Sequence, residues 1–233
     1  MLLLTLALAG AGIYTAVSFL QRSETLVSER CTAAVGTQSA ELATDQAVNA
    51  SLITAVAVQR GLPPRAASIA LATAMQESKL RNIAHGDQAG PDSRGLFQQR
   101  PSQGWGTEAQ VMNPYYAANA FYDALVKVPG YESLEITDAA QRVQRSAYPS
   151  RMPNTKIWAG PSHPAWPVRR PPPCCALCVP AGTGHPAAVE SELAQAYGPL
   201  AITTENDSLV VAAGGAQAWS VAQWAVANAK AWR

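Results

Sequence analysis

Glu77 is the side chain of this sequence best placed for acid–base chemistry. A helix predicted over residues 64–80 puts it on one face with four residues spaced by three and four positions, Ala66, Ile69, Ala70 and Thr73. Loss of water on such a face disfavours the carboxylate and should raise its pKa. A carboxylic acid still protonated near neutral pH can donate a proton to a leaving oxygen. The other interpretation is a glutamate at a helix end that pairs with Lys79 or Arg81.

Two short motifs flank a polar loop around this residue. The first is Ala-Met-Gln-Glu-Ser at residues 74–78, and the second is Gly-Leu-Phe-Gln at residues 95–98. Together and in this order they resemble the soluble lytic transglycosylase and goose-type lysozyme group of the lysozyme-like superfamily. In that group a Glu-Ser pair at a helix end supplies the catalytic acid, and a Gly-Leu-Met/Phe-Gln segment lines the cleft. The resemblance covers about residues 43–148, and residues 74–105 look like membrane-anchored actinobacterial members.

The resemblance implies roles for the residues of both motifs. Glu77 would protonate the leaving oxygen and then act as a base. Gln98 and the backbone around Gly95 would orient the substrate or the acid, and Gly95 would allow a close approach. Ser78 would form a hydrogen bond near the acid or simply end the helix. Phe97 fits the core better than a ligand contact.

Three further residues complete the predicted substrate site. Trp105, between two glycines in a loop, either stacks on a sugar ring or has a structural role. Asn119, on a helix opened by Pro114, resembles an asparagine that the group carries on such a helix. Tyr148 takes the place of a tyrosine in the group's Ala-Tyr-Asn motif, from which residues 143–148 otherwise depart.

The number of carboxylates bears on the reaction. A hydrolase generally uses two, separated by about 5–9.5 Å, and Asp87, Asp92 and Glu108 show no compelling spacing to Glu77. With one carboxylate, the N-acetyl group of the substrate can assist, and the muramyl 6-hydroxyl closes an anhydro ring. The sequence therefore favours a lytic transglycosylase that cuts MurNAc-GlcNAc bonds in peptidoglycan. The alternative is a non-catalytic, membrane-tethered protein that binds the cell wall or acts as a scaffold.

The expected fold is mainly α, with a lysozyme-like helical domain over residues 43–150. Helices are predicted from Thr44 or Asp45 to about Arg60, over residues 64–80, from Asn113–Pro114 to about residue 125, and from Thr137 or Asp138 to about residue 147. Ala117, Ala120, Phe121, Ala124 and Leu125 should form the core face of the third helix. The connector at residues 22–42 could hold a short hairpin.

The N-terminal segment predicts attachment to a membrane. Residues 2–20 carry no charge and can just span a hydrocarbon core of about 30 Å, so residues 1–21 are a transmembrane anchor or a signal segment. We expect a single-pass protein of the cell membrane with its domain on the extracytoplasmic side. The net charge of +1 gives no pull toward nucleic acid.

Residues 151–179 differ in composition from the rest of the chain. They are rich in proline and cysteine and contain no acidic residue, which is typical of a linker. Synonymous codons also permit a frameshifted stretch from about Ser150 to Cys178. Cys31 could form a disulfide with Cys174, Cys175 or Cys178, but these cysteines lack an evident fourth zinc ligand, so neither a metal nor another cofactor is expected.

Residues 180–233 are predicted to form part of an accessory α/β module. A helix over residues 186–197, a strand over residues 209–213 and a helix around Trp219 and Trp224 fit this module, which the chain is expected not to complete. No chemistry is assigned to it.

Overall fold

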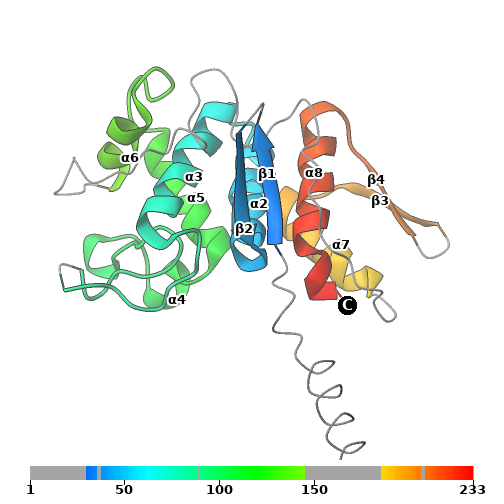
Figure 1. The fold of residues 1–233 in the computed structure, drawn as a ribbon, viewed down its shortest axis with the longest axis horizontal. Coiled ribbons are helices and arrows are strands. Elements are labelled where there is room, and N and C mark those ends of the chain that lie inside the picture. Colours follow the sequence, from blue (N-terminus) through cyan, green and yellow to red (C-terminus); the bar gives the residue numbers. More distant parts are fainter. Residues whose placement is uncertain (1–29, 36–37, 89, 145–184, 206–207, 233) are drawn as a thin grey trace, which may run out of the picture.

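The computed structural model describes residues 30–35, 38–88, 90–144, 185–205 and 208–232. Helix α2 (Thr44–Gln59) lies in the middle, with one group of elements on either side (Figure 1). The first group holds α3 (Pro64–Ser78), α4 (Glu108–Val111), α5 (Pro114–Leu125) and α6 (Ile136–Gln144). The second holds α7 (Pro186–Tyr197), β3 (Ala201–Glu205), β4 (Ser208–Ala212) and α8 (Gly215–Asn228). The described residues are thus mainly helical, as the sequence predicts.

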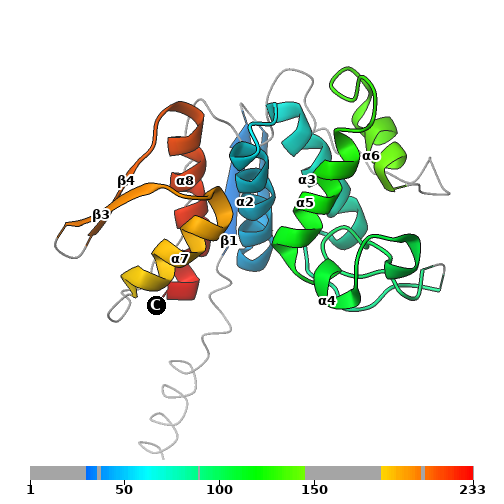
Figure 2. The ribbon, with the colours of Figure 1, turned by 180° about the vertical axis from the view of Figure 1, so that it is seen from behind.

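A hairpin precedes α2 and covers one side of it (Figures 1 and 2). Strands β1 (Arg30–Val35) and β2 (Gln38–Ala43) pair antiparallel, so the hairpin predicted for the connector is confirmed. Cys31 and Leu42 are opposite each other in the register and are both buried in the core. The hairpin therefore belongs to the folded body.

The N-cap of helix α2 lies at Ala43, before either predicted cap residue. Ala43 occupies the N-cap position without a side-chain cap, so the prediction of Thr44 or Asp45 is wrong. The side chain of Gln46 reaches back instead and accepts a hydrogen bond from the Ala43 N–H at 2.9 Å. At the other end Gly61 stops the helix as predicted, with a φ of 64° that suits glycine.

Proline and asparagine open the next helices as expected. Pro64 is in the first turn of α3, which ends at Ser78 because Lys79 has a left-handed backbone with a φ of 56°. The Asn113 side chain caps α5 by accepting hydrogen bonds from the N–H groups of Tyr115 and Tyr116 at 3.0 and 3.2 Å.

The core face of α5 differs in part from the prediction. Ala120 and Ala124 are only half-buried, and their predicted places are taken by Ala118 and Tyr122. The short helix α4 and the 3-10 helix η2 (Pro101–Gln103) were not predicted. Helix α6 begins at Ile136, before both predicted starts, Thr137 and Asp138.

The second group packs directly against α2. Helix α7 has the predicted bounds, α8 continues into the 3-10 helix η4 (Ala229–Trp232), and strand β3 was missed. Ala55 of α2 joins a second core cluster made by Leu193, Ala196, Tyr197, Val221 and Trp224. The side chain of Asn228 lies 3.4 Å from Ser51 Oγ in the same buried region. Helix α2 therefore contributes to both cores, and Figure 2 shows it between the two groups.

Several predicted features fall outside the described residues. They are the apolar segment at residues 2–20, Tyr148, the proline-rich stretch at residues 151–179 and the cysteines within it. In the ranges that the structure does describe, every helix is too short or too polar to cross a membrane.

Candidate functional site

Glu77 occupies the last turn of α3, where its carboxyl is half-buried. The four residues that share its helix face, Ala66, Ile69, Ala70 and Thr73, are fully buried. Burial, and to a lesser extent the negative charge of Asp87, together raise the pKa of Glu77 to about 7. The predicted direction of this pKa change is confirmed, so the acid is part protonated at neutral pH.

Glu77 forms no ion pair with Lys79 or Arg81, the two partners that the alternative interpretation requires. Arg81 pairs with Asp45 at 3.2 Å instead. Lys79 is exposed, and no ion pair joins it to Glu77 within the described part of the chain. Burial and the like charge of Asp87 therefore act on Glu77, and no salt bridge to it forms within the described ranges.

Ser78 connects the end of α3 to the second motif. Its hydroxyl is buried and lies 2.7 Å from the Leu96 carbonyl oxygen and 3.0 Å from that of Ala74, both of which can accept its hydrogen bond. The hydrogen bond to Leu96 fixes the segment of residues 95–98 beside the turn that carries Glu77. Ser78 thus has a structural role next to the acid.

Gly95 is required by a contact within the protein. Its φ is 78°, and a Cβ at this position would lie 2.2 Å from the carbonyl oxygen of Val111. Its N–H donates to the Ile83 carbonyl oxygen at 2.8 Å. The Val111 backbone occupies the place that a Cβ would take, which is a packing reason for glycine here, and the approach of a substrate to Gly95 stays a prediction.

The two side chains after Leu96 have different surroundings. Phe97 is fully buried and stacks on Phe121 with ring centroids 4.6 Å apart, which confirms its place in the core. Gln98 is half-buried and has a φ of 48°, a conformation that costs energy for a residue other than glycine. Its Nε2 donates to the Gly95 carbonyl oxygen at 3.1 Å, which leaves its Oε1 available for another donor.

Of the three other carboxylates considered, two are held by the loop itself. Hydrogen bonds from the Ser102 side chain and backbone, and then from Arg100, hold the pKa of Asp92 well below its usual range. The Ser102 N–H lies 3.0 Å and Arg100 Nε 2.8 Å from the carboxylate. Glu108 pairs with Arg94 at 3.3 Å. Asp87 is exposed, accepts from the Gly90 N–H at 2.8 Å and acts electrostatically on Glu77. It is the candidate for a second carboxylate.

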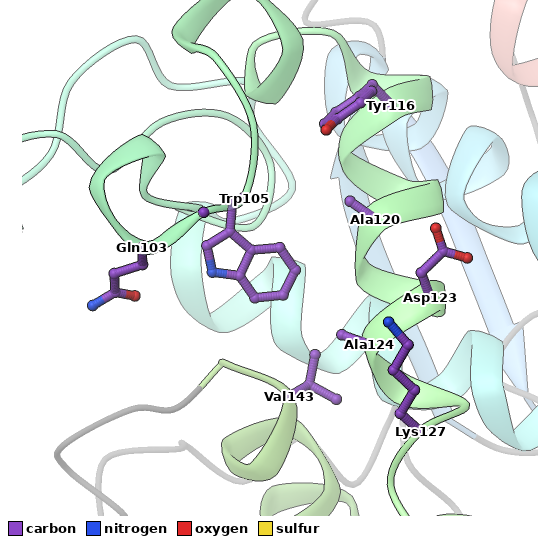
Figure 3. A pocket seen from close by; sticks show the side chains of 9 residues that line it. Gln103, Trp105, Tyr116, Ala120, Asp123, Ala124, Lys127 and Val143 are labelled. Carbon is purple, nitrogen blue, oxygen red and sulfur yellow. The ribbon is translucent and has the colours of Figure 1, made fainter.

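Trp105 lines a pocket with a volume of about 280 Å³ (Figure 3). The pocket lies between the loop around Trp105, helix α5 and the end of α6. Its other lining residues are Gln103, Gly104, Tyr116, Ala120, Asp123, Ala124, Lys127 and Val143. Glu77, Gly95, Gln98 and Asn119 do not line it. The α5 residues of this pocket were not predicted, although their helical spacing from Tyr116 to Lys127 is a signal that could have indicated them.

Asn119 faces the end of α2 instead. Its Oδ1 accepts a hydrogen bond from Arg60 at 3.0 Å, and its Nδ2 donates to the Tyr115 carbonyl oxygen at 2.9 Å. Arg60 also pairs with Asp123 at 2.6 Å. These contacts connect α2 with α5 and do not bring Asn119 to Glu77.

Metal binding gains no support from the described ranges, in which no group of three His, Cys, Asp or Glu side chains could hold an ion. The structure thus brings together Glu77, Ser78 and the segment of residues 95–98. It places Trp105 in a separate pocket and Asn119 in a helix contact.

A family model described as a lysozyme like domain matches residues 54–128. This range holds the described site residues from Glu77 to Asn119. The match supports a lysozyme-like domain here, and in general a glycosidase-type enzyme that acts on peptidoglycan. None of the curated proteins matches the chain.

Proposed function

We propose that this protein cleaves the glycan strands of peptidoglycan, with Glu77 as general acid and then as base. The observation that carries the proposal is the carboxyl of Glu77, whose pKa of about 7 lets it donate a proton near neutral pH. It lies within the range of the lysozyme-like match, beside a segment that Ser78 fixes by a hydrogen bond.

We favour a lytic transglycosylase that cuts MurNAc-GlcNAc bonds over a hydrolase. In that reaction Glu77 protonates the glycosidic oxygen as the bond to the anomeric carbon breaks. The same carboxylate then accepts the proton of the muramyl 6-hydroxyl as its oxygen bonds to that carbon, so no water is consumed. Asp87 is the group that would support hydrolysis instead, because a second carboxylate can activate water. The domain would then work outside the cytoplasm, and residues 2–20 would anchor or export it.

The second candidate is a non-catalytic wall-binding protein. The observation that favours it is the pocket under Trp105, which the side chain of Glu77 does not line.

The test compares the wild-type protein with Glu77→Gln on purified peptidoglycan. Released muropeptides should fall at least about 100-fold in the variant, because loss of a general acid typically costs 10²–10⁴-fold. Glu190→Gln, which changes an exposed glutamate of α7, is the matched control and should keep wild-type release. Equal release by wild type and Glu77→Gln would refute the catalytic assignment. Mass spectrometry of the products then distinguishes anhydro ends from reducing ends.

A further inference from the structure

The turn that follows Glu77 and Ser78 has an unusual backbone. Lys79 and Leu80 are both left-handed, with φ values of 56° and 58°. One left-handed residue commonly ends a helix, and glycine usually supplies it. Two in succession, both with side chains, cost energy, and such a conformation persists only where neighbouring groups hold it. The backbone directly after the candidate acid therefore depends on contacts with the rest of the fold.

The first turns of helix α2 supply these contacts. The side-chain amide of Asn49 donates to the Leu80 carbonyl oxygen at 2.7 Å. That of Gln46 donates to the Lys79 carbonyl oxygen at 2.8 Å. Because they are three positions apart, Gln46 and Asn49 share one face of α2. Both carbonyl groups of the strained turn thus receive a hydrogen bond from the same helix face.

An ion pair and a buried side chain extend the contact between the turn and α2. Arg81, the next residue, pairs with Asp45 of α2 at 3.2 Å, but both side chains are about half exposed, so this pair adds little. The side chain of Leu80 is fully buried in the core cluster to which α2 also contributes. The amides of Gln46 and Asn49 therefore provide the main polar part of the contact.

The same turn closes the end of helix α3. The Lys79 N–H donates to the Met75 carbonyl oxygen at 3.2 Å. The Leu80 N–H donates to the carbonyl oxygen of Ala74 at 3.1 Å. These hydrogen bonds close the last turn of α3, which carries Glu77. If the left-handed backbone relaxed, this turn would open and the carboxyl would gain water.

We infer that Gln46 and Asn49 are positioning residues for Glu77, because they hold the strained turn that keeps its carboxyl in its half-buried place. This inference rests on the proposed function, since it takes Glu77 as the acid. Burial is the main cause of the raised pKa of Glu77. Loss of the two amides should therefore lower this pKa toward 4.5.

The charged groups around the turn stay unchanged in the test of this inference. Asp87 is the charged group that raises the pKa of Glu77 in addition to burial. Asp45, Lys79 and Arg81 are the charged residues of the turn and of the α2 face that holds it. Substitution of a neutral amide leaves all four in place, so a change in the pKa of Glu77 reports its position.

A carboxyl NMR titration of Asn49→Ala measures the Glu77 pKa without any turnover. The pKa should fall from about 7 in the wild type to about 6 or lower, because the relaxed turn admits water. The maximal rate of muropeptide release should fall at least about 10-fold, since a misplacement of about 1 Å can cost about 100-fold. The amount of peptidoglycan that gives half of this rate should stay within about 2-fold, because a positioning residue does not touch the strand.

Two further variants complete the experiment. Gln46→Ala removes an exposed hydrogen bond, so it should fold and should lower the Glu77 pKa in the same direction. Asn228→Ala is the matched control, because this buried amide of α8 donates to the Trp224 carbonyl oxygen at 2.8 Å, in the second group of elements. It should keep the wild-type pKa and the wild-type rate.

The pKa and the rate separate the inference from the proposed function. A Glu77 pKa that stays at about 7 in both Gln46→Ala and Asn49→Ala would overturn the inference, and so would an equal fall in Asn228→Ala. An inactive wild type whose Glu77 pKa still falls in Asn49→Ala would refute the proposed function alone. The role of α2 in placing the carboxyl would then stand.

Discussion

Removing the carboxyl of Glu77 should change how stability depends on pH. Its pKa is about 7 in the folded protein against 4.5 in a solvated chain. Between these two pH values the folded state keeps a proton that the unfolded state releases, so unfolding becomes more favourable as the pH rises. The stabilisation from this proton is complete below pH 4.5 and is lost by about pH 7.

The size of the effect follows from the same two values. One pH unit corresponds to about 1.36 kcal/mol, so the full difference is about 3 kcal/mol. Because the side chain is only half-buried, solvent screening reduces this to about 2 kcal/mol. Glu77→Gln has no such proton, so the free energy of unfolding of the wild type should fall by about 2 kcal/mol relative to the variant between pH 4 and pH 8.

Urea unfolding followed by circular dichroism at several pH values measures this difference. Other carboxyls titrate in both proteins and cancel in the comparison. Glu190→Gln controls for the loss of one negative charge from the chain. If the unfolding free energies of wild type and Glu77→Gln stay parallel within about 0.5 kcal/mol over this range, the reasoning about buried Glu77 is wrong.

Two further predictions concern the neighbours of Glu77. Asp87→Asn should lower the Glu77 pKa but leave it above 4.5, because burial is the larger cause and stays in place; a carboxyl NMR titration checks this, and an unchanged pKa would contradict the contribution of Asp87. Ser78→Ala should destabilise the fold by about 1–3 kcal/mol in urea unfolding, because the buried Leu96 carbonyl loses its donor, whereas a loss no larger than that of exposed Ser133→Ala would contradict this.

Local chemistry explains which features the sequence could predict. The helix cap at Asn113 and the helix end at Gly61 depend only on residues within one turn. The types of those residues are therefore enough to predict both. The raised pKa of Glu77 follows from the apolar residues at helical spacing on its own face. These features need no knowledge of distant contacts.

The features that could not be predicted depend on contacts between residues far apart in the chain. The reason for Gly95 is the carbonyl of Val111, which its neighbours in sequence do not reveal. Ala120 and Ala124 cannot be distinguished by residue type from alanines of the core. They line a pocket because of where the Trp105 loop lies. Ala43 precedes α2 without a side-chain acceptor, and its own N–H donates to the Gln46 side chain from the first turn of the helix.

Helix α2 has a practical consequence for how this protein can be divided. A fragment that ends at residue 144 would contain the whole lysozyme-like match, yet it would expose the side of α2 that α7 and α8 cover. Ala55 and its neighbours would then form an apolar surface in water, the kind of surface that makes proteins aggregate. Such a fragment should express poorly for this reason alone. The sequence suggests a domain boundary after residue 144. The contacts of α2 with α7 and α8 show that the buried core continues across this boundary.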